Sequence, residues 1–252
     1  MTQQIALYQT LCALYYDLDK PTAPSDALRF FMQYAHQADG PILEPMCGTG
    51  RFLLPLLQAG FDIEGFDASD AMLAFLYQKD NHPIFKARVQ NALLHDFIPA
   101  HQYKLIFIPD GSLNLFIDEQ QAYTALQKLY DWLLPGGTLV LEIITNATIG
   151  HCTNSWTGDV QFITDHEYIM LSRLVLPVEN NIGTTICRYD LVNNMHIVQT
   201  EMENFKIRLY DQQIFTQLLH SVGFTNIKRL KVYDSQKEAK PTDRLVIFEC
   251  TK

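Results

Sequence analysis

The sequence predicts an α/β fold built on a mostly parallel sheet. In residues 41–108, short apolar runs alternate with helical patterns, which is typical of parallel strands joined by helices. Residues 160–209 follow a period of two, which is typical of antiparallel strands. The chain has 252 residues, 48% of them hydrophobic, so a single domain, 1–252, has enough apolar side chains for a sizeable core.

The first elements are predicted to be two helices. Apolar residues recur at spacings of three and four between residues 3 and 18, which indicates an amphipathic helix that ends before Pro21. Ser25 stands just ahead of an apolar segment, where its hydroxyl can cap the first turn of a second helix. Both helices precede the first strand.

Five strand–helix units are expected next. The pattern places strands or helices at 42–43, 51–59, 61–66, 70–79, 84–89, 104–108, 118–134 and 138–144. The two glycines of Pro135-Gly136-Gly137 can adopt the positive φ that turns the chain from the last helix into the last strand.

The pattern changes after Asn146. Antiparallel strands are predicted at 160–176, 182–192 and 195–209, with turns at 179–181 and 193–194. These strands would form an antiparallel layer inserted at 147–209. A helix at 211–222 is followed by two strand-like runs, 226–233 and 244–250, with no helix between them, so a terminal hairpin is expected.

Charge and cysteine content exclude several classes of protein. The formal net charge is −9 and no cluster of lysines and arginines occurs, so nucleic acid is not an expected partner. Five scattered cysteines without a CxxC pair predict neither a zinc site nor a disulfide framework. No leader and no apolar run near the ~18 residues that span a bilayer are present, so we expect a cytoplasmic protein without a membrane partner.

Two acids at strand ends indicate a nucleoside site. Residues 41–51 combine a strand, Glu44 and a Gly48-x-Gly50 loop that opens a helix, and a second strand ends in Asp67, 23 residues after Glu44. A carboxylate at such a strand end is placed to accept charge-assisted hydrogen bonds from a ribose diol. We therefore expect a nucleoside at the carboxyl edge of the sheet.

The loop argues against a dinucleotide. A dinucleotide fingerprint that starts at Gly48 needs its third glycine at position 53, where the chain has Leu53. No G-x-x-x-x-G-K-[ST] phosphate loop occurs either. The site therefore suits a nucleoside without phosphates that carries a positive group, which two nearby acids tolerate.

Five ordered motifs resemble those of the class I S-adenosylmethionine-dependent methyltransferases. The motifs are LEPMCGTGR, GFDAS, Gln90-Asn91-Ala92, Ile108-Pro109-Asp110-Gly111-Ser112 and LLPGGTLVLE, and the resemblance covers about residues 40–145 and the terminal hairpin. It implies a Rossmann-like seven-stranded fold with a C-terminal antiparallel hairpin, an inserted antiparallel β layer, and S-adenosylmethionine as cofactor. The residues that it implies as cofactor ligands are Glu44, Met46, Cys47, Gly48, Gly50, Arg51, Asp67, Ala68, Met72, Asn91, Ala92, Pro109 and Tyr16. Met46 departs from the family by replacing the usual first glycine of the loop.

Methyl transfer from a sulfonium to a small-molecule acceptor is the activity that the resemblance implies. Such an in-line displacement needs alignment and exclusion of water more than a strong base, so no catalytic residue is assigned and His151, His166 and His196 are not expected to be catalysts. Helices in 1–38 are expected to form a lid, with Tyr8, Tyr15 and Tyr16 over the cofactor. The candidates for the acceptor pocket are Tyr8, Asp110, Ser112, Asn114, Trp156, Arg173, Tyr210, and also Arg188 and Arg208.

Two other functions stay open at this point. One is an NAD(P)-dependent oxidoreductase, which Leu53 disfavours. The other is a catalytically idle module that binds the cofactor. Exposed edges of the inserted strands could pair across a two-fold axis, so a homodimer is also an expectation.

Overall fold

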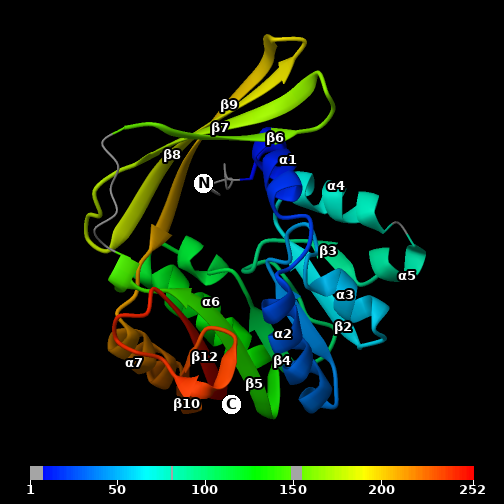
Figure 1. Ribbon diagram of the computed structural model, residues 1–252. Helices are drawn as coiled ribbons and strands as arrows, with labels where there is room; N and C mark the ends of the chain where they lie inside the picture. The colour runs from blue at the N-terminus through cyan, green and yellow to red at the C-terminus, as the bar shows by residue number, and fades with distance from the viewer. Residues whose placement is uncertain (1–7, 81, 149–154) are drawn as a thin grey trace.

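The computed structural model describes residues 8–80, 82–148 and 155–252 (Figure 1). Its body is one large sheet in which β1 to β5 are parallel and the C-terminal strands are antiparallel. In spatial order the strands are β11 (Asp234–Glu238), β10 (Thr225–Lys231), β12 (Leu245–Thr251), β5 (Leu133–Ile144), β4 (Tyr103–Ile108), β1 (Ile42–Pro45), β2 (Ile63–Asp67) and β3 (Val89–Asn91). The predicted α/β class and mostly parallel sheet are confirmed. The sheet has eight strands rather than seven, because β11 pairs with β10 beyond the predicted hairpin.

Helices cover both faces of this sheet. The helices are α1 (Thr10–Asp19), α2 (Ser25–Ala38), α3 (Leu53–Gln58), α4 (Asp70–Lys79), α5 (Pro83–Lys86), α6 (Glu119–Trp132) and α7 (Gln212–Val222), with short 3-10 turns η1 (Ser112–Leu115) and η2 (Asn146–Thr148). Alternate strand residues face opposite sides: Leu105 and Phe107 pack with α2 and α3, whereas Ile106 and Ile108 pack with α6 and α7. The parallel strands are buried on both faces, which is why they appear in the sequence as short apolar runs.

The N-terminal helices differ from the prediction at their starts. The helix α1 begins at Thr10, and Tyr8, which was predicted to lie on it, precedes it with φ of 56°. Residues 3–7 of the predicted helix lie outside the described residues. Ser25 is the first residue of α2 rather than its cap, because Pro24 occupies the capping position and no side chain caps the helix.

The predicted run of five strand–helix units is also only partly right. The apolar run 84–89 divides into α5, which Pro83 opens, and the three-residue β3. The fully described residues 92–102 contain turns and no helix, so β3 connects to β4 directly. Helices α4 and α7 match their predicted positions, where Ser69 and Asp211 accept backbone hydrogen bonds as caps.

A second sheet of four antiparallel strands lies over the carboxyl end of the central sheet, with α1 between them (Figure 1). Its strands are β6 (Thr157–Phe162), β7 (Glu167–Val175), β8 (Ile182–Asn193) and β9 (His196–Arg208). The predicted strand 160–176 is two strands, because Ile163 and Thr164 donate to the carbonyl of Glu167 in a turn. The predicted turns are confirmed: Asn180, Asn181 and Asn194 have positive φ.

The helix α1 is held by the inserted sheet. Leu11, Cys12 and Tyr15 pack on Ile169 and Tyr189 of that sheet. Within the described ranges, no helix is long and apolar enough to cross a membrane.

Candidate active site

The site lies where the carboxyl ends of β1, β2 and β4 meet. The strand order reverses between β1 and β4, since β2 and β3 continue on one side and β5 on the other. Ligands of open α/β sheets bind outside the strand ends at such a point. Glu44 is in β1, Asp67 ends β2, and Asp110 follows β4, so three carboxylates gather at this edge.

The loop between β1 and α3 is a tight glycine turn. Met46, Gly48 and Gly50 have φ of 59°, 55° and 76°, so methionine keeps the left-handed conformation that a glycine would favour. A Cβ on Gly50 would lie 2.9 Å from Leu76, whereas a Cβ on Gly48 would meet nothing within 4 Å. The backbone at Gly48 is therefore open to a ligand. The amide of Cys47 donates to Phe66 and ties this loop to β2.

Asp67 holds the loop and the start of α4 together. Its Oδ2 accepts from the amide of Gly48 at 2.8 Å and its Oδ1 from the amide of Ser69 at 2.8 Å. Burial raises the pKa of Asp67, and the hydrogen bonds from Ser69, Gly48 and Ala68 oppose that rise. Each oxygen retains a second lone pair, so the carboxylate can still accept hydrogen bonds from the hydroxyls of a sugar.

Glu44 contains an unpaired buried oxygen. The residue is 2% exposed, and its Oε2 has no hydrogen-bond partner in the described part of the chain. Burial raises the pKa of Glu44 well above its usual range, while the charge of Arg51 opposes that rise. Because buried polar atoms nearly always have partners, a donor from a ligand is expected here. The unpaired oxygen and the open backbone at Gly48 together fit the methionine end of the implied cofactor.

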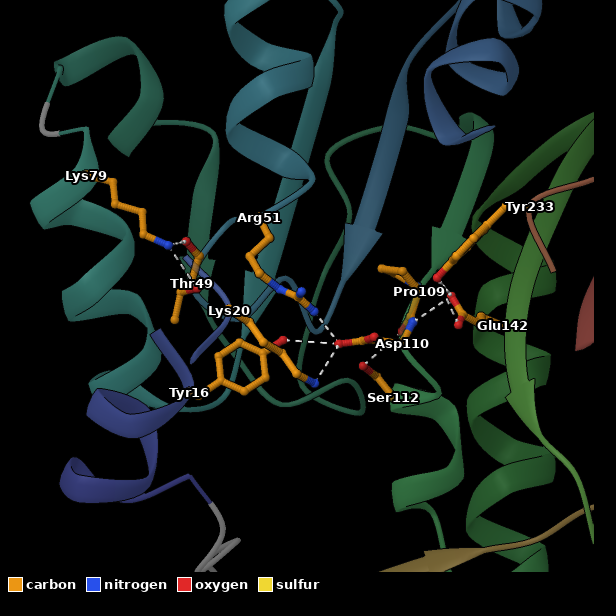
Figure 2. Close-up of polar contacts among 10 residues, drawn as sticks. All are labelled: Tyr16, Lys20, Thr49, Arg51, Lys79, Pro109, Asp110, Ser112, Glu142 and Tyr233. Atoms are coloured by element: carbon orange, nitrogen blue, oxygen red, sulfur yellow. Dashed lines mark hydrogen bonds and ion pairs between the residues drawn. The ribbon is translucent and has the colours of Figure 1, made fainter. Parts of the chain in front are cut away.

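Four polar side chains meet at the mouth of the site (Figure 2). The guanidinium of the buried Arg51 pairs with the Asp110 carboxylate and lies 5.1 Å from the ring centre of Tyr16. The hydroxyl of Tyr16 donates to Asp110 at 3.3 Å, and Lys20 lies 3.8 Å from the same carboxylate. The sequence motifs place Tyr16 and Arg51 with the cofactor and Asp110 with the acceptor, and the structure brings these three together. Lys20 was missed, because nothing in its local pattern distinguishes it from a solvated lysine.

The remaining predicted cofactor ligands surround the ends of β2, β3 and β4. Asn91 is aligned with Asp67 across β2 and β3, and it donates to Asp70 at 2.9 Å. The amide of Ala92 donates to the carbonyl of Asp67 at 3.0 Å. Ala68 is exposed, Met72 is buried in the first turn of α4, and Pro109 is buried after β4.

Besides Asp110, two of the predicted acceptor residues lie close to the mouth. Tyr8 packs edge-on against Tyr16, with 6.2 Å between ring centres. Ser112 donates to the carbonyl of Pro109 at 3.2 Å, beside Asp110.

The others have different surroundings. Asn114 is fully buried and donates to the carbonyls of Ile144 and Arg208, so it anchors the inserted sheet to β5. Trp156 is 50% exposed. Arg173 is exposed on β7, Arg188 pairs with Asp190, and Arg208 pairs with Glu119.

Tyr210 is buried, and its hydroxyl has no partner among the described residues. Burial raises its pKa to about 12, which Arg208 opposes. His166 and His196 are exposed at strand ends, and His151 lies outside the described residues. No group of three or more metal-binding side chains occurs in the parts of the chain that the structure covers.

Comparison with known proteins supports the predicted methyltransferase resemblance. Residues 42–137, which carry β1 to the start of β5 and the site above, match the family model described as a methyltransferase domain. This match, together with the similarities below, supports a class I S-adenosylmethionine-dependent methyltransferase. It is similar to "Putative methyltransferase GWCH70_2453" of Geobacillus sp. (strain WCH70), with 26% identity over 144 residues, 55% of this chain and 58% of that protein.

Two solved structures share the methyltransferase fold. An S-adenosylmethionine-dependent methyltransferase from Clostridium acetobutylicum ATCC 824 superposes with a TM-score of 0.77 at 16% identity, covering 94% of this chain and 96% of that one. The sugar N-methyltransferase KedS8 from Streptoalloteichus sp ATCC 53650 superposes with a TM-score of 0.75 at 16% identity, covering 95% of this chain and 91% of that one. The sequence alignments span only about half the length of the curated relatives.

Proposed function

We propose that the protein transfers a methyl group from S-adenosylmethionine to a small-molecule acceptor. The observation that carries this proposal is the buried, unpaired oxygen of Glu44 beside the open backbone of Gly48 and the carboxylate of Asp67. When bound, this cofactor supplies a methyl group on a sulfonium that is already activated for displacement. The chain's own tasks are therefore to bind, to orient the acceptor and to exclude water.

The roles of the binding residues follow from their chemistry. Asp67 would accept hydrogen bonds from the ribose hydroxyls, and Glu44 with the glycine loop would hold the amino-acid end. Asn91 and Ala92 would contact the adenine, with Ala68 and Met72 beside it. The acids of the crevice also favour a cationic ligand, because opposite charges attract more strongly where water is excluded.

The residue at position 53 disfavours the dinucleotide alternative. Leu53 is fully buried as the first residue of α3, at the position where a dinucleotide loop needs a glycine for close approach of a pyrophosphate. No second observation favours an oxidoreductase.

Amines are the first acceptor class to test. The similar KedS8 is named a sugar N-methyltransferase. Phenols and carboxylic acids complete the panel.

Transfer of label from S-adenosylmethionine to these acceptors tests the proposed function. Labelled product above that of the Asp67→Asn variant supports the proposal. Binding of the cofactor without transfer to any acceptor would instead support an idle binding module.

We further propose that the chain is a single domain, 1–252. In it, residues 1–38 act as a lid and residues 147–209 form the inserted layer. Lys79 on α4 supports this, since its Nζ forms an ion pair with Asp17 on α1 at 2.5 Å. The same Nζ donates to Thr49 Oγ1 on the glycine loop at 3.2 Å (Figure 2). It also donates to the carbonyl of Pro21 at 3.1 Å. One lysine thus joins α1, the segment after it and the cofactor loop.

Replacing Lys79 with methionine is expected to loosen this lid. Half-buried ion pairs contribute on the order of 1 kcal/mol, so backbone hydrogen exchange in α1 should become about fivefold faster. Mass spectrometry of exchanged peptides measures this change. Lys86→Met is the control, because Lys86 is an exposed lysine on α5. Equal exchange rates in the two variants would contradict the lid proposal.

We also propose a homodimer in a reducing cytoplasm. The edge strands β6 and β9 carry exposed apolar side chains, among them Phe162, Val198 and Met202. Light scattering after gel filtration should give twice the mass of 28.9 kDa, and a mass of one chain would refute the dimer. Four described cysteines, Cys12, Cys47, Cys187 and Cys250, are free and buried, which suits a reducing compartment.

A further inference from the structure

The backbone at Asp110 has an unusual conformation that must be held in place. Asp110 and Gly111 follow β4 with φ of 60° and 69°, two consecutive left-handed residues. A residue with a Cβ rarely adopts this conformation unless its surroundings impose it. A Cβ on Gly111 would lie 2.8 Å from Ile144 of β5, so the chain is packed tightly against β5 here.

Glu142 of β5 provides one hydrogen bond that holds this turn. Its side chain is buried, with the residue 1% exposed, and its Oε2 accepts from the amide of Asp110 at 3.0 Å. The hydroxyl of Tyr233 lies 3.1 Å from both carboxylate oxygens of Glu142 and donates from the opposite side. Figure 2 shows the carboxylate between the Asp110 backbone and the Tyr233 ring.

Tyr233 is itself fixed. It lies in the turn between β10 and β11 with φ of 57°, and its ring packs against Phe30 of α2 with 6.0 Å between ring centres. The C-terminal hairpin therefore reaches the cofactor crevice through Glu142 and the backbone of Asp110.

We propose that Glu142 is a positioning residue for the cofactor site: held by Tyr233, it fixes Asp110 in the conformation that directs its carboxylate to Arg51 and Tyr16. Arg51 follows the Gly48-x-Gly50 loop directly, and Tyr16 comes from the lid helix. Glu142 would thereby set the shape of the crevice mouth without touching the cofactor. This inference rests on the proposed function, since the quantity it affects is cofactor affinity.

A buried acid makes this arrangement sensitive to pH. Burial raises the pKa of Glu142 to about 7, with the Asp110 amide opposing the rise and the Asp110 charge adding to it. Tyr233 and Arg51 also face the carboxylate and lower its pKa, while β12 presents the apolar Ile247 opposite. The ionised carboxylate accepts hydrogen bonds more strongly than the neutral acid, so the grip on Asp110 weakens as the pH falls through about 7.

Stability and affinity should therefore change in opposite directions with pH. The folded pKa of Glu142 lies above its unfolded value, so its contribution to stability is complete below the unfolded pKa and is lost as the pH rises through about 7. Cofactor affinity should instead rise over the same interval. If the Glu142 side chain only filled space, its effect on stability would be the same at every pH, and so would its effect on affinity.

Glu142→Gln tests the proposal, because it removes the charge and keeps the shape. Binding of S-adenosylhomocysteine, measured by calorimetry, should be about tenfold weaker than in the wild type at about pH 8.5 and nearly equal at about pH 5.5. Without ligand, the melting temperature of the variant relative to the wild type should rise between the same pH values. Glu44 and Asp67 also titrate, but they are present in both proteins and cancel in the ratio.

Glu64→Gln is the matched control. Glu64 lies on β2 and accepts a hydrogen bond from the hydroxyl of Tyr103 at 2.7 Å, so the two residues form a second Glu–Tyr pair in the same sheet. This variant should keep wild-type affinity at both pH values. Tyr233→Phe, which keeps the carboxylate, should weaken binding at about pH 8.5 in the same direction as Glu142→Gln.

The outcomes separate the two proposals. A wild-type protein that binds no S-adenosylhomocysteine at either pH overturns the proposed function and this inference with it. A wild type that binds, with a Glu142→Gln ratio that is constant over pH or equal to that of Glu64→Gln, overturns only the inference.

Discussion

Replacing Asp67 with alanine is expected to weaken the binding of S-adenosylhomocysteine by about a hundredfold or more. The substitution removes the acceptor proposed for the ribose and also the hydrogen bonds that hold the amides of Gly48 and Ser69. Hydrogen bonds to a charged acceptor contribute about 1.5–3 kcal/mol each. The loss of two such bonds from the ribose hydroxyls therefore accounts for about a hundredfold loss of affinity or more. Calorimetric titration measures the affinity.

Asp62→Ala is the matched control for this prediction. Asp62 precedes the same strand, at its other end, and forms an ion pair with Arg88 while 53% of its side chain is exposed. Its replacement should leave the affinity unchanged. An Asp67→Ala protein that binds as tightly as the wild type would show that the carboxylate is not a cofactor ligand.

Replacing Gly48 with alanine is expected to block the crevice while costing little stability. Gly48 has a left-handed φ of 55°, and a Cβ at this position would meet no protein atom within 4 Å, so only a bound ligand would collide with the added methyl group. The free energy of unfolding should fall by only about 1 kcal/mol, the usual cost of alanine at positive φ. The affinity for S-adenosylhomocysteine should fall by at least about tenfold, because the methyl group occupies the open space beside the loop backbone that the ligand is proposed to fill.

Gly60→Ala separates these two effects. Gly60 also has a left-handed φ, 88°, and a Cβ there also meets nothing within 4 Å, but it lies in the exposed turn after α3. Denaturant titration should give both variants a similar loss of stability, and calorimetry should give only Gly48→Ala a loss of affinity. A similar affinity in the two variants would place the ligand away from Gly48.

The features that could be predicted from the sequence are those set by residues close together in the chain. The helix α7 has a capping Asp211 and a terminating Gly223, and both act over a few residues, so its bounds were readable from the sequence. Asp67 was readable for a similar reason, because parallel strands bring their carboxyl ends to one edge and its strand is an apolar run that ends in an acid.

Contacts between distant segments explain what could not be predicted. Glu142 and Tyr233 are 91 residues apart, and neither stands in a pattern that points to the other. Lys79 meets Asp17 and Thr49 only because α4 folds back over the glycine loop. Asp110 was recognised as a residue of the site, but its pairing with Arg51 depends on a turn that only the packing of β4 on β5 creates.

The central claim is that the carboxyl edge of the sheet binds S-adenosylmethionine through Asp67 and the glycine loop. Calorimetric titration of the wild type with S-adenosylhomocysteine, and separately with NADH, tests it most directly. We predict one S-adenosylhomocysteine per chain, lost in Asp67→Ala, and no binding of NADH. No binding of S-adenosylhomocysteine, or binding of NADH that is lost in Asp67→Ala, would contradict the claim.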